Sequence, residues 1–135
     1  MILIVGCGRL GGSLATRLAS AGQEVIVLDH DRRNFEMNLP KHYKGMKCEG
    51  MEIDNDVLKR AEIERACAVA ALARDESTNM MVADVARKIF NVPRIIVRID
   101  EPRMAALYRS QGFEVVSPVG DTAVALAQAL SPAEA

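Results

Sequence analysis

Apolar and polar positions divide the chain into two alternating kinds of segment. Short apolar runs, typical of strands buried on both faces, predict strands over residues 1–5, 24–29, 66–73, 94–100 and 113–116. A sixth, short strand is expected over 46–49, in the stretch where the pattern is weakest. Apolar residues at helical spacing predict helices over residues 9–21, 75–90 and 121–130. Further helices are expected over 31–39, which must end before Pro40, over 55–61, with Asp54 as N-cap, and over 102–111. Because strand and helix alternate from end to end, the sequence predicts a Rossmann-like, doubly wound α/β fold. Its sheet is expected to be mostly parallel and six-stranded, with helices on both faces.

Length and composition narrow the class of protein. The 135 residues correspond to one domain, which we place at residues 1–118. Residues 119–135 are expected to hold the last helix and a frayed tail over 131–135. A net charge of -1 and an aromatic content of 4% argue against a nucleic-acid partner, which would need a basic face or stacking platforms.

Cysteine usage and hydropathy point to a cytoplasmic protein that does not insert into a membrane. The three cysteines lack any CxxC spacing and are interpreted as free thiols. No apolar run approaches the roughly 20 residues of a membrane span. The apolar N-terminus has no basic residue before it, so it is interpreted as a strand rather than an export signal. His30 and His42 have no ligand partners at metal-binding spacing, so no metal site is expected.

A glycine-rich turn follows the first predicted strand and opens the first predicted helix. Gly6, Gly8 and Gly11 fit the GxGxxG pattern, with Arg9 and Leu10 between the last two. In this context Gly6 permits the tight turn, Gly8 lets the backbone approach a pyrophosphate, and Gly11 allows close packing of helix on strand. The free N–H groups of the helix N-terminus would bind the phosphates.

An acidic residue completes this pattern at the end of the second predicted strand. Asp29 lies 18 positions after Gly11, where a carboxylate can accept hydrogen bonds from both ribose hydroxyls. Because that carboxylate would repel a 2′-phosphate, NAD(H) or an adenine nucleotide (ADP/ATP) is favoured over NADP(H). Arg32 and Arg33 lie close enough to weaken the preference.

Signals for catalysis are weak. Tyr43 and Lys47 have the YxxxK spacing of short-chain dehydrogenases, but that pair must lie on a helix, and Gly45 stands between them. No arrangement of nucleophile and base is recognisable, so the chain is not expected to be an enzyme.

Over nearly its whole length the chain resembles the N-terminal nucleotide-binding domain of TrkA and Ktr potassium-uptake regulators, the RCK or KTN domain. The stretches at 5–29, 55–79 and 92–119 and the terminal helix carry the match. The motif GxGRxGxxxAxxL is shared with other Rossmann proteins, whereas VPRIIVRIDEP and GFEVVSP are more specific. The resemblance implies a regulatory domain that binds NAD(H) or adenine nucleotides and couples ligand state to a membrane potassium transporter.

The resemblance also implies site residues and an assembly. The candidate cofactor-binding set is Gly6, Gly8, Arg9, Leu10, Gly11, Asp29, His30, Asp54, Asn79 and Arg98. Such domains form homodimers and rings, and their terminal helix crosses to a second subunit. This chain departs from the family pattern after the Gly of the third-strand turn, where Met51 replaces an acidic or amide residue and Glu52 follows. The smaller C-terminal ligand domain of full-length regulators is absent from the sequence.

Two other interpretations stay open at this point. The chain could be the cofactor domain of an NAD-dependent oxidoreductase whose catalytic half is missing. It could also be a small redox or nucleotide sensor without a channel partner. The absence of recognisable catalytic residues counts against the first of these.

Overall fold

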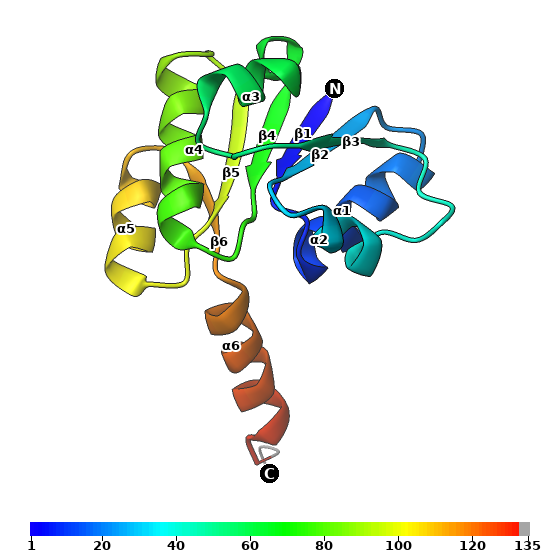
Figure 1. Cartoon of the computed structure of the whole chain (residues 1–135). Coiled ribbons are helices and arrows are strands. Elements are labelled where there is room, and N and C mark those ends of the chain that lie inside the picture. Colours follow the sequence, from blue (N-terminus) through cyan, green and yellow to red (C-terminus); the bar gives the residue numbers. More distant parts are fainter. Residues whose placement is uncertain (133–135) are drawn as a thin grey trace.

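Six parallel strands form the centre of the molecule, in the order β3-β2-β1-β4-β5-β6 (Figure 1). The computed structural model describes residues 1–132. Every strand pairing in that range is parallel. The strands are β1 (Ile2–Val5), β2 (Val25–Asp29), β3 (Met46–Glu49), β4 (Ala68–Ala71), β5 (Arg94–Arg98) and β6 (Glu114–Val116). The predicted doubly wound α/β fold is therefore confirmed.

Helices cover both faces of the sheet, α1 and α2 on one face and α3, α4 and α5 on the other (Figure 1). Their bounds are α1 (Arg9–Ser20), α2 (Arg32–Asn38), α3 (Asn55–Arg60), α4 (Glu76–Lys88), α5 (Pro102–Ser110) and α6 (Pro118–Leu130). A short 3-10 helix, η1 (Ile63–Arg65), was not predicted. It follows Glu62, whose φ of 65° ends the preceding helix in a left-handed turn.

Side chains alternate along each central strand, so that each face of the sheet has its own core. Leu3, Val5 and Leu28 pack on the α3–α5 face. Ile4 and Val27 pack on the α1–α2 face. All five side chains are fully buried, which fixes the register of β1 against β2 and holds the carboxyl ends of the two strands side by side.

The last helix does not belong to either layer. It begins at Pro118, three positions earlier than predicted, because proline presets the φ of a first helical residue. None of its residues is buried, and the helix projects away from the sheet (Figure 1). Docking of this helix on its own sheet, the alternative to a subunit contact, is therefore not what the structure shows. Of the predicted tail over 131–135, residues 133–135 lie outside the described range.

Candidate functional site

The glycine-rich turn lies at the carboxyl edge of the sheet, between β1 and α1. Gly6 has a φ of +102°, and a Cβ there would lie 2.6 Å from the Cα and N of Ala73, at the end of β4. A Cβ on Gly11 would overlap the carbonyl oxygen of Gly6. Both glycines are thus required by close backbone approach. Around Gly8, by contrast, nothing lies within 4 Å of the Cβ position, so the backbone there faces open space.

The N-terminus of α1 offers backbone donors at this opening. The first N–H groups of a helix have no intrahelical acceptor. Gly8, as N-cap, supplies no side-chain acceptor, and the first turn contains no acidic residue. Arg9 and Leu10 are exposed beside the loop. The helix end can therefore receive an anion without displacing a group of the protein.

Asp29 is the last residue of β2 and is only 4% exposed. Its Oδ2 accepts a hydrogen bond from Cys7 N at 2.8 Å. Its Oδ1 accepts hydrogen bonds from Asp31 N at 2.8 Å and from Asn34 Nδ2 at 3.0 Å. A carboxylate offers about four acceptor positions, so one position, on Oδ2, is left for a ligand. The carboxylate thus joins the glycine-rich loop to the start of α2 as well as facing the site.

His30, the next residue, is hydrogen-bonded to the buried carboxylate of Glu52. Its Nδ1 lies 2.8 Å from Glu52 Oε1, and its backbone N donates to the same oxygen at 3.1 Å. Glu52 is 5% exposed, whereas the His30 side chain is 57% exposed. The hydrogen bond to Glu52 and the negative charge of Glu52 raise the pKa of His30, with smaller contributions from Asp29 and Asp31.

The three side chains of Asp29, His30 and Glu52 lie close enough to suggest a metal site. One ligand atom from each falls within 4.8 Å of the others. However, Asp29 Oδ1, the oxygen nearest the His30 ring, already accepts two hydrogen bonds. A metal there would break these bonds, so the donor set is built for hydrogen bonding rather than for a cation.

Three further residues of the predicted cofactor-binding set make contacts within the fold. Asp54 is the N-cap of α3, and its Oδ1 accepts from Asp56 N at 2.8 Å. Asn79 is fully buried and bonds to Ala73 N and O, each at 2.7 Å, and to Arg98 O at 3.1 Å. Asn79 therefore joins the ends of β4 and β5 directly beneath the glycine-rich loop. The Arg98 side chain is about three-quarters buried and lies 3.6 Å from Asp100 Oδ2.

A family model matches the part of the chain that holds this loop, strand end and helix. The TrkA-N domain model matches residues 2–118. The chain belongs to the TrkA-N domain family.

Known proteins similar to this TrkA-N domain are linked to potassium transport and to membranes. It is 37% identical over 134 residues to the Trk system potassium uptake protein TrkA of Streptomyces coelicolor, covering 99% of this chain and 60% of that protein. The structure superposes on the TrkA-N domain of the inner membrane protein ybaL from Escherichia coli with a TM-score of 0.82, at 19% identity over 96% of each chain. It also superposes on the GsuK channel bound to NAD, with a TM-score of 0.70 and 22% identity, over 85% of this chain and 21% of that one.

The matches differ in how much of each known protein they cover and in what they support. The TrkA-N domain spans about 60% of the length of the curated Streptomyces relative. Among the described residues, no helix is long and apolar enough to cross a membrane. The two structural matches, both under 25% identical, support the fold alone.

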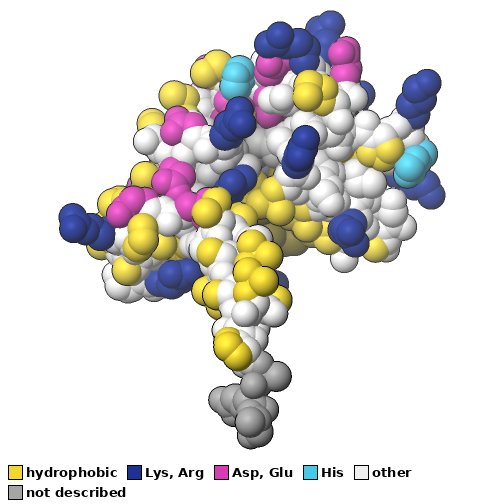
Figure 2. Space-filling model, turned by 90° about the horizontal axis from the view of Figure 1, so that it is seen from below, with side chains coloured by type: hydrophobic (Ala, Val, Ile, Leu, Met, Phe, Trp, Pro, Cys, Tyr) yellow, Lys and Arg dark blue, Asp and Glu magenta, His cyan; other side chains and the backbone are white. Residues whose placement is uncertain are grey.

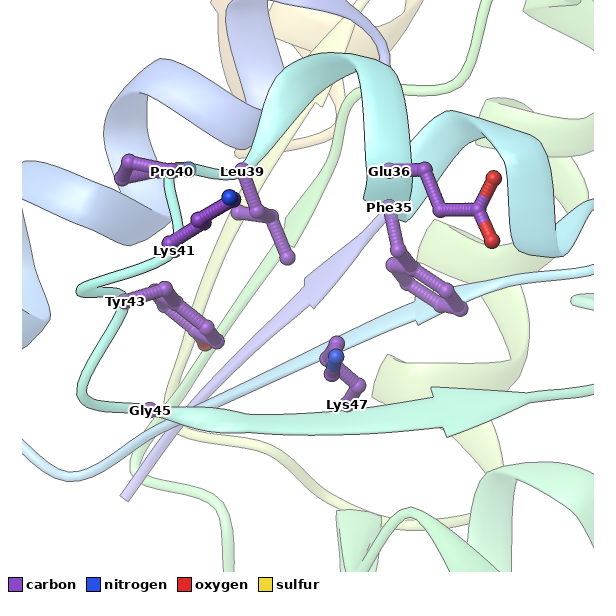
Figure 3. A pocket seen from close by; sticks show the side chains of 8 residues that line it. All are labelled: Phe35, Glu36, Leu39, Pro40, Lys41, Tyr43, Gly45 and Lys47. Atoms are coloured by element: carbon purple, nitrogen blue, oxygen red, sulfur yellow. The ribbon is translucent and has the colours of Figure 1, made fainter.

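The TrkA-N domain also has a hollow of about 360 Å³ away from the glycine-rich loop (Figure 3). None of the predicted cofactor-binding residues lines it. Its lining comes from α2, β3 and the segment between them: Phe35, Glu36, Leu39, Pro40, Lys41, Tyr43, Gly45 and Lys47.

Tyr43 and Lys47, the YxxxK pair, both line this hollow but are not arranged as in a dehydrogenase site. Tyr43 lies in the segment before β3 and Lys47 on β3, so the two are not one helical turn apart. The Tyr43 hydroxyl donates to Met46 O at 3.1 Å. Burial raises the pKa of Tyr43 to about 12, whereas a tyrosine that exchanges protons in catalysis needs a pKa nearer neutrality. The interpretation of this spacing as coincidental is supported.

Sequence reasoning missed one residue of the site. Glu52 was noted as following Met51 but was not included in the candidate set. Met51 is 53% exposed, and Glu52 is the side chain that turns inward toward His30. A signal was available, since an acidic residue just after the third strand adjoins the end of the second strand in this topology.

Proposed function

We propose that this TrkA-N domain binds NAD(H) or an adenine nucleotide (ADP/ATP) at the carboxyl edge of its sheet. The carrying observation is that Gly8, open to solvent at the head of α1, and Asp29, with one free acceptor position, lie at the ends of the adjacent strands β1 and β2. The pyrophosphate occupies the α1 N-terminus, and Asp29 Oδ2 accepts a hydrogen bond from a ribose hydroxyl. Arg9 reaches the phosphates from the mouth of the site.

We further propose that nucleotide binding regulates a membrane potassium transporter or channel. Support comes from the Streptomyces TrkA, which is named as a potassium uptake protein, and from GsuK, a channel whose structure was solved with NAD. The domain acts at the cytoplasmic side of the membrane through that transporter partner. The alternative interpretation is the cofactor domain of an NAD-dependent oxidoreductase. The geometry of Tyr43 and Lys47 does not support it.

The proposed assembly is a homodimer or larger ring formed through α6. This helix exposes apolar side chains whose exposed fractions are 65% for Val119, 58% for Val124 and Leu126, and 83% for Leu130. Figure 2 shows apolar side chains along the projecting helix and on the adjoining underside of the domain. Exposed apolar side chains of this kind are costly in water and are characteristic of a protein contact. A second copy of the chain, as in the resembling family, is the proposed occupant.

The test is calorimetric titration of the purified chain with NAD⁺, NADP⁺, ADP and ATP. Gly8→Ala should abolish binding, because the added methyl group stands where the phosphates approach, while the fold tolerates it in open space. Gly120→Ala, on the exposed helix α6, is the matched control and should bind as the unmodified chain does. Unchanged binding by Gly8→Ala, or no binding of any nucleotide by the unmodified chain, would refute the proposal.

A further inference from the structure

The position of His30 in the fold places it at the base end of the proposed nucleotide site. The phosphates lie over β1, and the ribose lies at Asp29 on β2, so the base extends toward the next strand, β3. His30 follows β2, and Glu52 lies in the turn after β3. Their side chains meet at 2.8 Å, so together they border the space that the base enters.

The charges around His30 are unbalanced when its ring is neutral. Asp29 faces the ring with Nδ1 to Oδ1 at 3.8 Å, and Glu52 lies at 2.8 Å. Neither carboxylate has an arginine or lysine partner within the described residues. Among the other charged groups nearby, Asp31 pairs with Arg33 at 2.9 Å and Glu49 pairs with Arg32 at 3.0 Å, while the Arg60 guanidinium donates to the Glu49 carbonyl oxygen. Within the described residues, His30 is thus the one ion-pair partner of Asp29 and Glu52, and it supplies a positive charge only when its ring is protonated.

The bonding of His30 leaves one ring nitrogen for the ligand. An ionised carboxylate only accepts hydrogen bonds, so Nδ1 carries a proton in both charge states of the ring. Protonation therefore occurs at Nε2, for which the described residues provide no hydrogen-bond partner. The proton adds a positive charge and a new donor to a side chain that is 57% exposed.

We propose that nucleotide binding to this domain is proton-linked through His30, with the protonated ring as the form that favours the ligand. The inference rests on the proposed function and adds a regulation to it. A protonated His30 offsets one of the two carboxylates, which reduces repulsion of an anionic nucleotide, and it donates from Nε2 toward the base. Binding therefore weakens as the pH rises through the pKa of His30, and bound nucleotide raises that pKa in turn.

The experiment measures the Kd of NAD⁺ by calorimetry from about pH 5.5 to about pH 8.5, the range in which a histidine titrates. NAD⁺ is the probe because the terminal phosphate of a mononucleotide titrates near pH 6 and would obscure the result. The Kd should rise several-fold across this range. With one linked proton its slope is at most about tenfold per pH unit.

Variants separate His30 from other titrating groups. His30→Asn retains an N–H for Glu52 Oε1 but cannot titrate, so its Kd should be independent of pH. Glu52→Gln removes the charge that favours protonation, so the midpoint should move to lower pH. His42→Asn, in the exposed segment before β3, is the matched control and should behave as the unmodified chain.

Magnetic resonance gives a second measurement that does not depend on calorimetry. The chain has only two histidines, so the ring signal lost in His30→Asn identifies His30. Its titration should move to higher pH when NAD⁺ is added. Equal pH dependence of the Kd in His30→Asn and the unmodified chain, or an unmoved His30 titration, would overturn the proton linkage and leave the proposed function standing. Absence of NAD⁺ binding at every pH would overturn both.

Discussion

The Asp29 carboxylate accepts a hydrogen bond from the backbone N–H of Cys7, 2.8 Å away and 22 positions earlier in the chain. This bond joins the glycine-rich loop to the end of β2. The Cys7 thiol beside it is fully buried. Burial, and then the negative charge of Asp29, raise the pKa of the thiol to about 12, so Cys7 stays protonated and packs as a small apolar side chain. The residue proposed to bind ribose is therefore also a tie between two structural elements.

Replacement of Asp29 should have two separable effects. In Asp29→Ala the donors of Cys7, Asp31 and Asn34 lose their acceptor, which should lower the free energy of unfolding by about 2–4 kcal/mol. Loss of the charge-assisted bond to ribose should also weaken NAD⁺ binding by a few kcal/mol at most. Urea denaturation measures the first effect, and calorimetry at a temperature where the variant is folded measures the second.

Cofactor preference follows from the same carboxylate. The unmodified chain should bind NAD(H) or ADP/ATP far more tightly than NADP(H), because a 2′-phosphate would face the Asp29 charge. Arg32 and Arg33 form ion pairs with Glu49 and Asp31, which a 2′-phosphate would have to displace in order to bind them. Calorimetric affinities for NADP(H) equal to or tighter than those for NAD(H) would contradict this expectation.

Asn79 should be important for stability. Asn79→Ala leaves the Ala73 N–H and two carbonyl oxygens without their partners in a fully buried position and opens a small void. We expect a loss of about 3 kcal/mol in the free energy of unfolding. Asn55→Ala, on the exposed first turn of α3, is the control and should change stability little. Thermal or urea unfolding of the two variants would decide the matter, and equal stabilities would show that the Asn79 bonds are dispensable.

Self-association should depend on the apolar face of α6. Val124→Glu puts a charge on the exposed apolar surface of this helix and should convert the dimer to monomers or cause aggregation. Met37→Glu, at a position on α2 that is 77% exposed, is the matched control and should remain dimeric. Light scattering over a range of concentrations measures both. A concentration-independent monomer for the unmodified chain would rule out this contact.

Dehydrogenase activity is not expected of the chain. Tyr43 is hydrogen-bonded to its own backbone segment, and burial raises its pKa to about 12, which disfavours proton transfer near neutral pH. Incubation with NAD⁺ or NADH and a panel of alcohols, hydroxy acids and amino acids should leave the NADH absorbance unchanged. Robust turnover that Gly8→Ala abolishes would instead support the oxidoreductase interpretation.

The sequence by itself determined the elements and the outline of the site. Hydrophobic patterns together with helix caps and prolines located the six strands and six α-helices of the described residues, because most of these segments are buried on at least one face. The glycine-rich turn and Asp29 could likewise be identified from spacing, since a turn and a strand end impose their requirements within a few residues. The start of α6 was placed late, at 121 rather than at Pro118, because the apolar pattern of a helix is weak in its first turn.

The tertiary structure decided which groups meet across the carboxyl edge of the sheet. Asp29 uses three of its acceptor positions within the protein, Glu52 rather than Met51 turns inward to His30, and Asn79 is buried between two strand ends. The bonds of Asp29 to Cys7, of His30 to Glu52 and of Asn79 to Arg98 join residues about 20 positions apart, so these pairings depend on strand order and register. The departure of α6 from the sheet also depends on tertiary packing. The apolar residues of this helix indicate that it packs against something, but only the fold shows whether it packs on its own domain or on another molecule.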